Sequence, residues 1–168
     1  MVNKIMRSAL LLTLLASISA CGFHLRGNIP LSDGIKNLYV SAPKGPFKDR
    51  LENILGRSGA VLAETEGAAD AILVVTDASS RRTVGTLDEL GKVDSYNLRF
   101  RVKYTLVDPA GDPIRPLKTL VENRQYNFEP ETVVETEAEE AELQESMEQD
   151  ISLRIVRQLS TITDYTPK

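Results

Sequence analysis

The sequence predicts an α+β fold in which two helices pack on one face of a four-stranded mixed or antiparallel sheet. Three observations support this prediction. Apolar residues recur at helical spacing in 47–55 and again in 143–162, residues 96–106 alternate between apolar and polar, and the elements follow in the order strand, helix, three strands, helix. Both helices need an apolar surface to cover, and the alternating strand supplies one.

The first strand and the first helix are separated by a proline-rich break. Residues 38–40 (Leu-Tyr-Val) read as a short strand, and the Pro-Lys-Gly-Pro sequence of 43–46 ends it. Pro46 suits the first turn of a helix, and Gly59 suits the position just after a helix C-terminus. Between them, four apolar residues share one helical face: Phe47, Leu51, Ile54 and Leu55.

Three strands follow, and the middle one has the clearest pattern in the chain. Residues 71–84 predict a long strand that begins apolar and becomes polar, followed by a polar loop at 85–95. In 96–106 the alternation indicates one buried face and one exposed face that carries cations. The Asp-Pro-Ala-Gly turn of 108–111 then leads to a strand at 118–128.

A long amphipathic helix is predicted from Val133 onward, because apolar residues recur every three or four positions as far as Ile162. Residues 129–150 contain ten Asp or Glu and no Lys or Arg. Acidic residues are favourable near a helix N-terminus, where the macrodipole is positive. We interpret the acidic run as a solvated or partner-facing helix surface, since it lacks the Asp-x-Asp-x-Asp-Gly loop of a calcium site.

The N-terminal segment has the layout of a signal peptide at residues 1–20. Lys4 and Arg7 precede an apolar run at 8–18, which closes on Ile-Ser-Ala-Cys. A transmembrane anchor is the alternative, but it would need roughly 20 apolar residues. The segment between Lys4 and Cys21 is shorter than that and contains Arg7.

The end of this segment resembles the lipobox of bacterial lipoproteins, with a branched Ile18 three residues before the cut and Cys21 directly after it. The resemblance implies that the Cys21 sulfur receives a diacylglycerol, that the chain is cut before Cys21 and that the new amine is acylated. Several acyl chains make such an anchor effectively permanent. Gly22 stands where an Asp would favour retention in the inner membrane, so it favours the outer membrane.

The remaining chain has the usual size of one domain. We expect a lipidated tether at 21–36, a single α+β domain at 37–165 and a frayed tail at 166–168. Cys21 is the only cysteine and His24 the only histidine, which excludes catalytic triads, Cys/His dyads and His-based zinc sites. The formal net charge of −4 gives no reason to expect nucleic-acid binding. We predict no enzyme, no metal site and no cofactor.

Residues 21–27, Cys-Gly-Phe-His-Leu-Arg-Gly, resemble the start of the mature lipopolysaccharide-assembly lipoproteins of the LptE family, also called rare lipoprotein B. Members begin with a cysteine, a glycine, an aromatic residue and His-Leu-Arg. The resemblance continues through the Gly-Pro that opens the first helix, the long hairpin to Tyr96, the proline-rich turn near Pro116 and the acidic last helix. It covers about residues 21–162.

The resemblance implies a fold, a partner and a place. The family domain is two helices on a four-stranded sheet, and it sits as a plug within the β-barrel protein LptD. Together the two proteins form the outer-membrane translocon that delivers lipopolysaccharide to the outer leaflet, with the lipoprotein anchored on the periplasmic side. An accessory role agrees with the predicted elements, because a membrane barrel needs eight or more strands.

The resemblance also implies contact with lipopolysaccharide, whose phosphorylated head group attracts cationic side chains. The family has basic residues at the hairpin tip and at the start of the last helix, where this chain has Glu89 and Thr136; Lys92 is a candidate replacement for the first. The candidate contacts lie around the hairpin end and on the exposed strand face: Arg81, Arg82, Lys92, Arg99, Arg101 and Lys103. The alternative is that these cations keep an open sheet soluble and discourage edge aggregation.

Two other functions compete with a translocon subunit. The cationic strand face would also suit a free-standing lipoprotein that binds an amphiphile or a cell-wall component. Such binding should weaken with salt, because exposed charges are screened. A hydrolytic enzyme would have to use Asp88 and Glu89, the most suggestive acidic pair in a loop, but adjacent loop carboxylates are usually only solvated.

Overall fold

The computed structural model describes residues 30–129 and 133–167, and the side chains of 133–135 lie outside this description. The predicted signal peptide, the lipidation site Cys21 and the block at 21–27 therefore lie outside the described residues. The elements follow in this order: η1 (Asp33–Ile35), β1 (Asn37–Ser41), α2 (Pro46–Arg57), β2 (Val61–Leu62), η2 (Glu66–Ala68), β3 (Ala71–Val84), β4 (Ser95–Val107), β5 (Pro113–Asn127) and α3 (Val133–Ser160).

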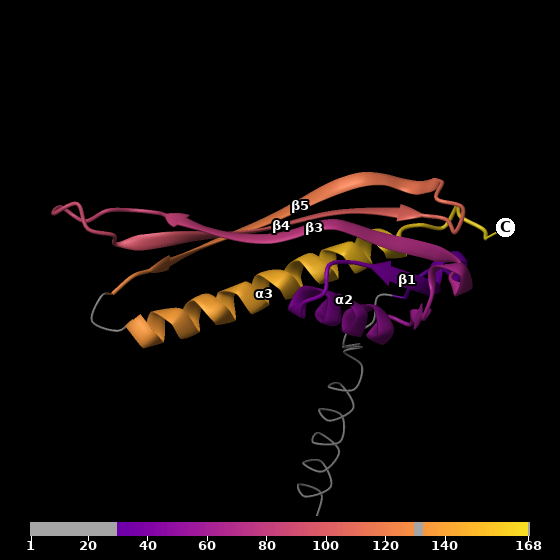
Figure 1. Cartoon of the computed structure of the whole chain (residues 1–168), viewed down its shortest axis with the longest axis horizontal. Coiled ribbons are helices and arrows are strands. Elements are labelled where there is room, and N and C mark those ends of the chain that lie inside the picture. The colour runs from indigo at the N-terminus through magenta and orange to yellow at the C-terminus, as the bar shows by residue number, and fades with distance from the viewer. Residues whose placement is uncertain (1–29, 130–132, 168) are drawn as a thin grey trace, which may run out of the picture.

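The two helices cover one face of a mixed sheet, as predicted (Figure 1). The sheet has the order β2-β1-β3-β4-β5; β1 is parallel to both β2 and β3, and the β3–β4 and β4–β5 pairs are antiparallel. The core lies between the layers, where Phe47 of α2 meets Phe100 of β4 edge to face at 5.3 Å. Its largest fully buried side chains include Leu51, Leu55, Leu73, Leu98, Leu106, Met147, Ile151 and Ile155.

The predicted count of four strands is wrong, because the sheet has five. The additional strand, β2, is two residues long and both of its side chains are exposed, so it carries no alternating pattern. It forms because the chain turns back after α2 and runs beside β1. There the amide of Val61 donates to the carbonyl of Lys36 at 2.7 Å, and the amide of Ala63 donates to that of Leu38 at 2.9 Å.

The last strand also begins earlier than predicted, at Pro113 rather than at residue 118. The proline-rich segment near Pro116 is thus part of β5 and not a turn. Proline is tolerated here because β5 is an edge strand, where a missing amide need not remove a ladder hydrogen bond. The pairing shifts register at this place, between Tyr104 and Leu106 of β4.

Helix α2 confirms the predicted boundaries. Gly45 precedes it with φ of 152°, Pro46 occupies its first turn, and Gly59 follows its C-cap with φ of +88°. The left-handed conformation of Gly59 favours glycine, since a residue with a side chain would be strained at this position. The predicted apolar face of α2 is buried against the sheet and α3.

Strands β3 and β4 form a long hairpin that extends beyond the helices (Figure 1). The short α2 covers the half near β1, and the first half of α3 runs beneath the other half. The burial of β3 follows this arrangement: its residues are buried from Ala71 to Leu73 and exposed from Ser80 to Val84. The hairpin therefore has one well-covered end and one projecting end.

Candidate functional site

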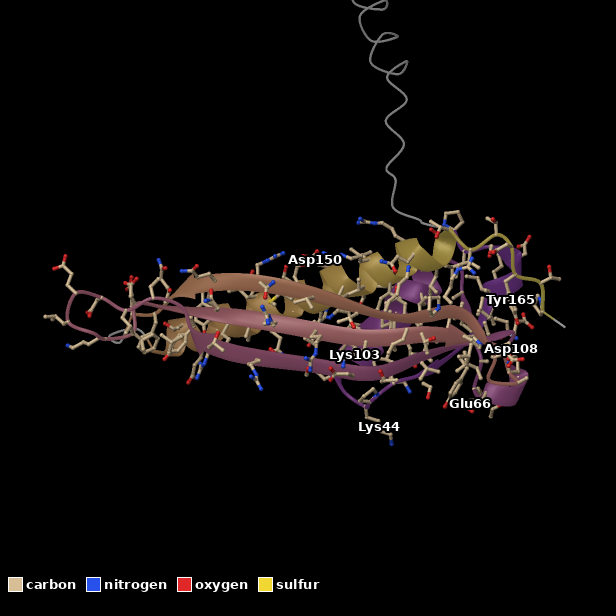
Figure 2. All side chains as sticks on the ribbon, turned by 90° about the horizontal axis from the view of Figure 1, so that it is seen from above. Lys44, Glu66, Lys103, Asp108, Asp150 and Tyr165 are labelled. Atoms are coloured by element: carbon tan, nitrogen blue, oxygen red, sulfur yellow. The ribbon has the colours of Figure 1, made fainter. Side chains whose placement is uncertain are left out.

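Four of the six predicted cations lie together on the side of β3–β5 that faces away from the helices. Arg81 of β3 is directly opposite Arg99 of β4, and Arg101 and Lys103 follow at alternate positions along β4. We call the surface carrying these four residues the open face. Figure 2 views the molecule from above, with Lys103 labelled on β4. Strand alternation places Arg99, Arg101 and Lys103 on one face, as the sequence predicted, and the β3–β4 register adds Arg81 to them.

Two cations of the open face are held by neighbours, and two are not. Arg101 Nε donates to Asp77 Oδ2, and Arg99 Nε donates to Asn123 Oδ1, both at 2.9 Å. Within 30–129 and 133–167, the side chains of Arg81 and Lys103 have neither a hydrogen bond nor an ion pair. Asp77 is the carboxylate that shares this face, so the local charge is strongly positive.

A hollow of about 370 Å³ lies in the open face. It is lined by Asp77, Ser79, Ser80, Arg81, Arg99 and Arg101. Like charges directly opposite each other destabilise a sheet pair, and Arg81 and Arg99 are such a pair. An anionic group in the hollow would offset this repulsion and would meet the Ser79 hydroxyl as well as guanidinium groups.

Arg82 is placed on the opposite side of the hairpin, facing α3. Its Nη1 lies 2.7 Å from Glu140 Oε2, and its guanidinium lies 4.7 Å from the centre of the Tyr96 ring. The Tyr126 hydroxyl donates to the same carboxylate oxygen of Glu140. The Tyr126 and Glu140 oxygens together raise the pKa of the Arg82 guanidinium. Arg82 therefore joins the hairpin to α3.

Lys92 lies apart from the open face, in the loop that joins β3 to β4. This loop is organised by Asp88, whose Oδ1 accepts hydrogen bonds from the amides of Leu90 at 2.9 Å and Lys92 at 2.8 Å. Asp88 thus has a structural role in the loop, whereas Glu89 is exposed. Thr136, at the other position where a basic residue was expected, is buried on α3.

The acidic helix has intramolecular partners that the sequence did not predict. Arg50 of α2 lies 2.9 Å from Glu145 and 3.5 Å from Glu148, and Arg124 of β5 lies 2.8 Å from Asp150. Together with Glu140, four acidic residues of α3 are thus ion-paired, while Glu137, Glu139 and Glu142 are exposed. For Arg124, the alternation of β5 was a signal in the sequence, because Arg124 shares a face with the buried Tyr126 and therefore lies on the helix side of the sheet.

Glu122 of β5 is the centre of a second network on the helix side. It pairs with Arg124 on its own strand and lies 2.8 Å from Arg154 of α3, and its side chain is only 15% exposed. Burial alone would raise the pKa of Glu122, but the hydrogen bonds and charges of the two arginines outweigh it and lower the pKa. The carboxylate is therefore ionised at neutral pH.

The described residues contain no cluster of three or more side chains suited to hold a metal ion. Within the same residues, no helix is both long enough and apolar enough to cross a membrane. The open face carries Arg81, Arg99, Arg101 and Lys103 beside Asp77.

The chain is similar to proteins of lipopolysaccharide assembly. The family model described as "LptE: Lipopolysaccharide-assembly" matches residues 35–159. The LPS-assembly lipoprotein LptE of Photorhabdus laumondii is 29% identical over 157 residues, which cover 91% of this chain and 85% of the relative.

Solved structures of lipoproteins share the fold. A lipoprotein B from Nitrosomonas europaea superposes with a TM-score of 0.69 at 26% identity, over 83% of this chain and 90% of the other. A minor lipoprotein from Acinetobacter baumannii gives 0.65 at 27% identity, over 78% and 93%. The family is one of lipopolysaccharide transport and not a known family of enzymes. Because the family model spans every element from the end of η1 almost to the end of α3, the chain belongs to the LptE family of lipopolysaccharide-assembly lipoproteins.

Proposed function

We propose that this chain is the lipoprotein subunit of the outer-membrane translocon that delivers lipopolysaccharide to the outer leaflet. Its partner would be the β-barrel protein LptD, in which it would sit as a plug. The match of the LptE model to residues 35–159 is the observation that carries this proposal. In the proposed arrangement, acyl chains on Cys21 hold the domain at the periplasmic side of the outer membrane.

The length of the hairpin supports the plug role. At about 3.3 Å per residue, the 14 residues of β3 extend roughly 45 Å. The hydrocarbon core of a bilayer is only about 30 Å thick. A hairpin of this length can therefore run along the lumen of a barrel while the other end of the domain stays near the anchored tether.

The open face supports a contact with the phosphorylated part of lipopolysaccharide. Arg81 and Lys103 are free to bind phosphate oxygens, and Arg99 and Arg101 are already oriented by Asn123 and Asp77. Pre-orientation reduces the entropy lost on binding. Of the six candidates, these four form one surface, Lys92 would act separately at the loop, and Arg82 would first have to leave Glu140.

A pull-down tests the plug role. The full chain, tagged at its C-terminus and expressed in a Gram-negative host, is purified from outer membranes solubilised in mild detergent. We expect a large β-barrel protein to copurify in about equal amount. A Cys21→Ala variant is the matched control, because it keeps the domain and removes the acylation site. Absence of a barrel from the wild-type preparation would refute the plug role.

Lipopolysaccharide binding tests the open face. The double variant Arg81→Gln/Lys103→Gln removes two charges without breaking an internal contact, and Lys44→Gln/Arg57→Gln is a control that removes two exposed charges elsewhere. Only the Arg81→Gln/Lys103→Gln variant should bind lipopolysaccharide more weakly, by about tenfold. It loses the hydrogen bonds from Arg81 and Lys103 to phosphate oxygens, and hydrogen bonds between charged groups are strong. Equal binding by both variants would remove the open face from the proposal.

A free-standing amphiphile-binding lipoprotein is the second candidate, and the hollow in the open face favours it because the domain alone forms that hollow. The pull-down discriminates between the two functions. A free-standing protein would bind anionic lipid with a steep salt dependence and without a barrel partner.

A further inference from the structure

The loop joining β3 to β4 carries an apolar group at the far end of the hairpin. We call residues 84–94 the tip. Its exposed apolar side chains are Val84, Leu87 and Leu90, which are 51%, 58% and 80% exposed. Single exposed apolar residues are normal, but three within eleven residues at one projecting point offer apolar area that another surface can cover.

The tip is held in one conformation by its own hydrogen bonds. Asp88 Oδ1 accepts two backbone amides, the amide of Asp88 donates to the carbonyl of Lys92 at 2.8 Å, and Gly91 adopts φ of +77°. The hydroxyl of Thr86 donates to Asp94 Oδ2 at 2.8 Å. A preformed loop loses little conformational entropy when it binds. The leucines are therefore presented in a fixed arrangement.

The rest of the described chain leaves the tip uncovered. Figure 1 shows the tip at the opposite end of the molecule from β1, α2 and the C-terminus, and beyond the first turn of α3. The exposed fractions of the two leucines agree with this position. No segment within 30–129 or 133–167 buries these side chains, so they are available to another molecule.

The charges of the tip favour a protein over a lipid surface. Asp88, Glu89 and Asp94 outnumber Lys92, so the tip is net negative. Anionic lipids attract segments rich in Lys and Arg and would repel this one. Residues 84–94 also lack the Trp and Tyr that characterise membrane interfaces. A recess that is apolar inside and basic at its rim fits the tip best.

We infer that the tip docks into an apolar recess with a basic rim on the β-barrel partner, with Leu87 and Leu90 as the buried anchors. This inference rests on the proposed function. It adds a second kind of contact at the end of the hairpin that lies far from the anchored tether. The tip contact is apolar, whereas the contact of the open face is ionic.

The test compares two double variants of the full lipidated chain. Leu87→Ser/Leu90→Ser removes the anchors but keeps the Asp88 hydrogen bonds. Val61→Ser/Leu117→Ser is the matched control, because these residues are 63% and 59% exposed elsewhere. Copurified barrel should fall at least about tenfold for the tip variant, since each leucine buries apolar area on binding. The control should recover as much barrel as the wild type, and both variants should melt like the wild type.

Two further measurements separate the interpretations. Glu89→Lys should lower the recovery of the barrel, because a lysine at this position would meet the basic rim with the same charge. A photocrosslinker at Leu90 should label the barrel. Equal losses in both double variants, full recovery by the tip variant, or crosslinks to lipid would each overturn the inference. If the wild type itself recovers no barrel, the proposed function fails and the inference fails with it.

Discussion

The two faces of the hairpin use the same type of side chain for different purposes. Arg81 and Arg82 are neighbours in sequence, yet Arg81 lies on the open face opposite Arg99, and Arg82 pairs with Glu140 beneath the sheet. On the open face the cations have few carboxylate partners and remain available to a ligand. On the helix side the arginines bind the acidic helix and hold the hairpin to α3. Strand alternation alone separates the two roles.

The largest effect on stability is expected at Glu122, the centre of the helix-side network. Glu122→Ala should lower the free energy of unfolding by about 2 kcal/mol, because it removes a carboxylate that is only 15% exposed and accepts charge-assisted hydrogen bonds from Arg124 and Arg154. Asn123→Ala, the adjacent residue on the other face, should change it by less than about 0.5 kcal/mol. Urea denaturation of both variants measures the difference, and equal effects would show that the two faces do not differ.

Acid should reveal the same network. The pKa of Glu122 in the folded protein lies below its ordinary value of 4.5, so its contribution is fully present above about pH 4.5 and is lost as the pH falls through the folded pKa. The stability difference between wild type and Glu122→Gln should therefore shrink from pH 7 towards pH 3. Denaturation midpoints at several pH values measure it. A difference that grows on acidification would contradict the lowered pKa.

Arg82 should have a smaller effect, because its side chain is half exposed. Arg82→Ala removes an ion pair and a cation–π contact, which together are worth about 1 kcal/mol at such a site. Thermal unfolding measures this change. Hydrogen exchange of β3 residues 80–84 should also accelerate, since Arg82 connects this part of the hairpin to α3. Unchanged exchange would argue that other contacts hold the hairpin.

Arg81→Ala should have the smallest effect. Its side chain has no partner among the described residues and faces Arg99, so stability should stay within about 0.5 kcal/mol of the wild type or rise slightly. The same variant should bind lipopolysaccharide more weakly than the wild type does. Arg82→Ala should cause a smaller loss of binding. A destabilised Arg81→Ala variant would mean that the open face is structural and not a binding surface.

Local sequence patterns were sufficient for most elements. Pro46 and Gly59 marked the ends of α2, and the alternation of 96–106 identified both faces of β4. The pattern was insufficient for β2, which has two exposed residues, and for the start of β5, where proline usually indicates a turn. Both errors concern edge strands of the sheet. A strand that is paired on one side only tolerates exposed residues and proline, so its sequence alternates less clearly between apolar and polar residues.

The candidate site was predicted in part. Alternation placed Arg99, Arg101 and Lys103 on one exposed surface, and the structure adds Arg81 to it through the β3–β4 register. Two partners of the acidic helix were not predictable, since Arg50 and Arg82 are 95 and 58 residues away from Glu145 and Glu140. No short-range pattern reports contacts of that separation.

The sequence by itself determined the order of the elements, the two helical stripes and the cationic side of β4, because these depend on periodicities of two and of about 3.6 residues that any chain segment expresses locally. Only the tertiary structure decided which cations are free and which are paired. That outcome depends on strand register and on where α3 crosses the sheet, and both are set by the packing of the whole core.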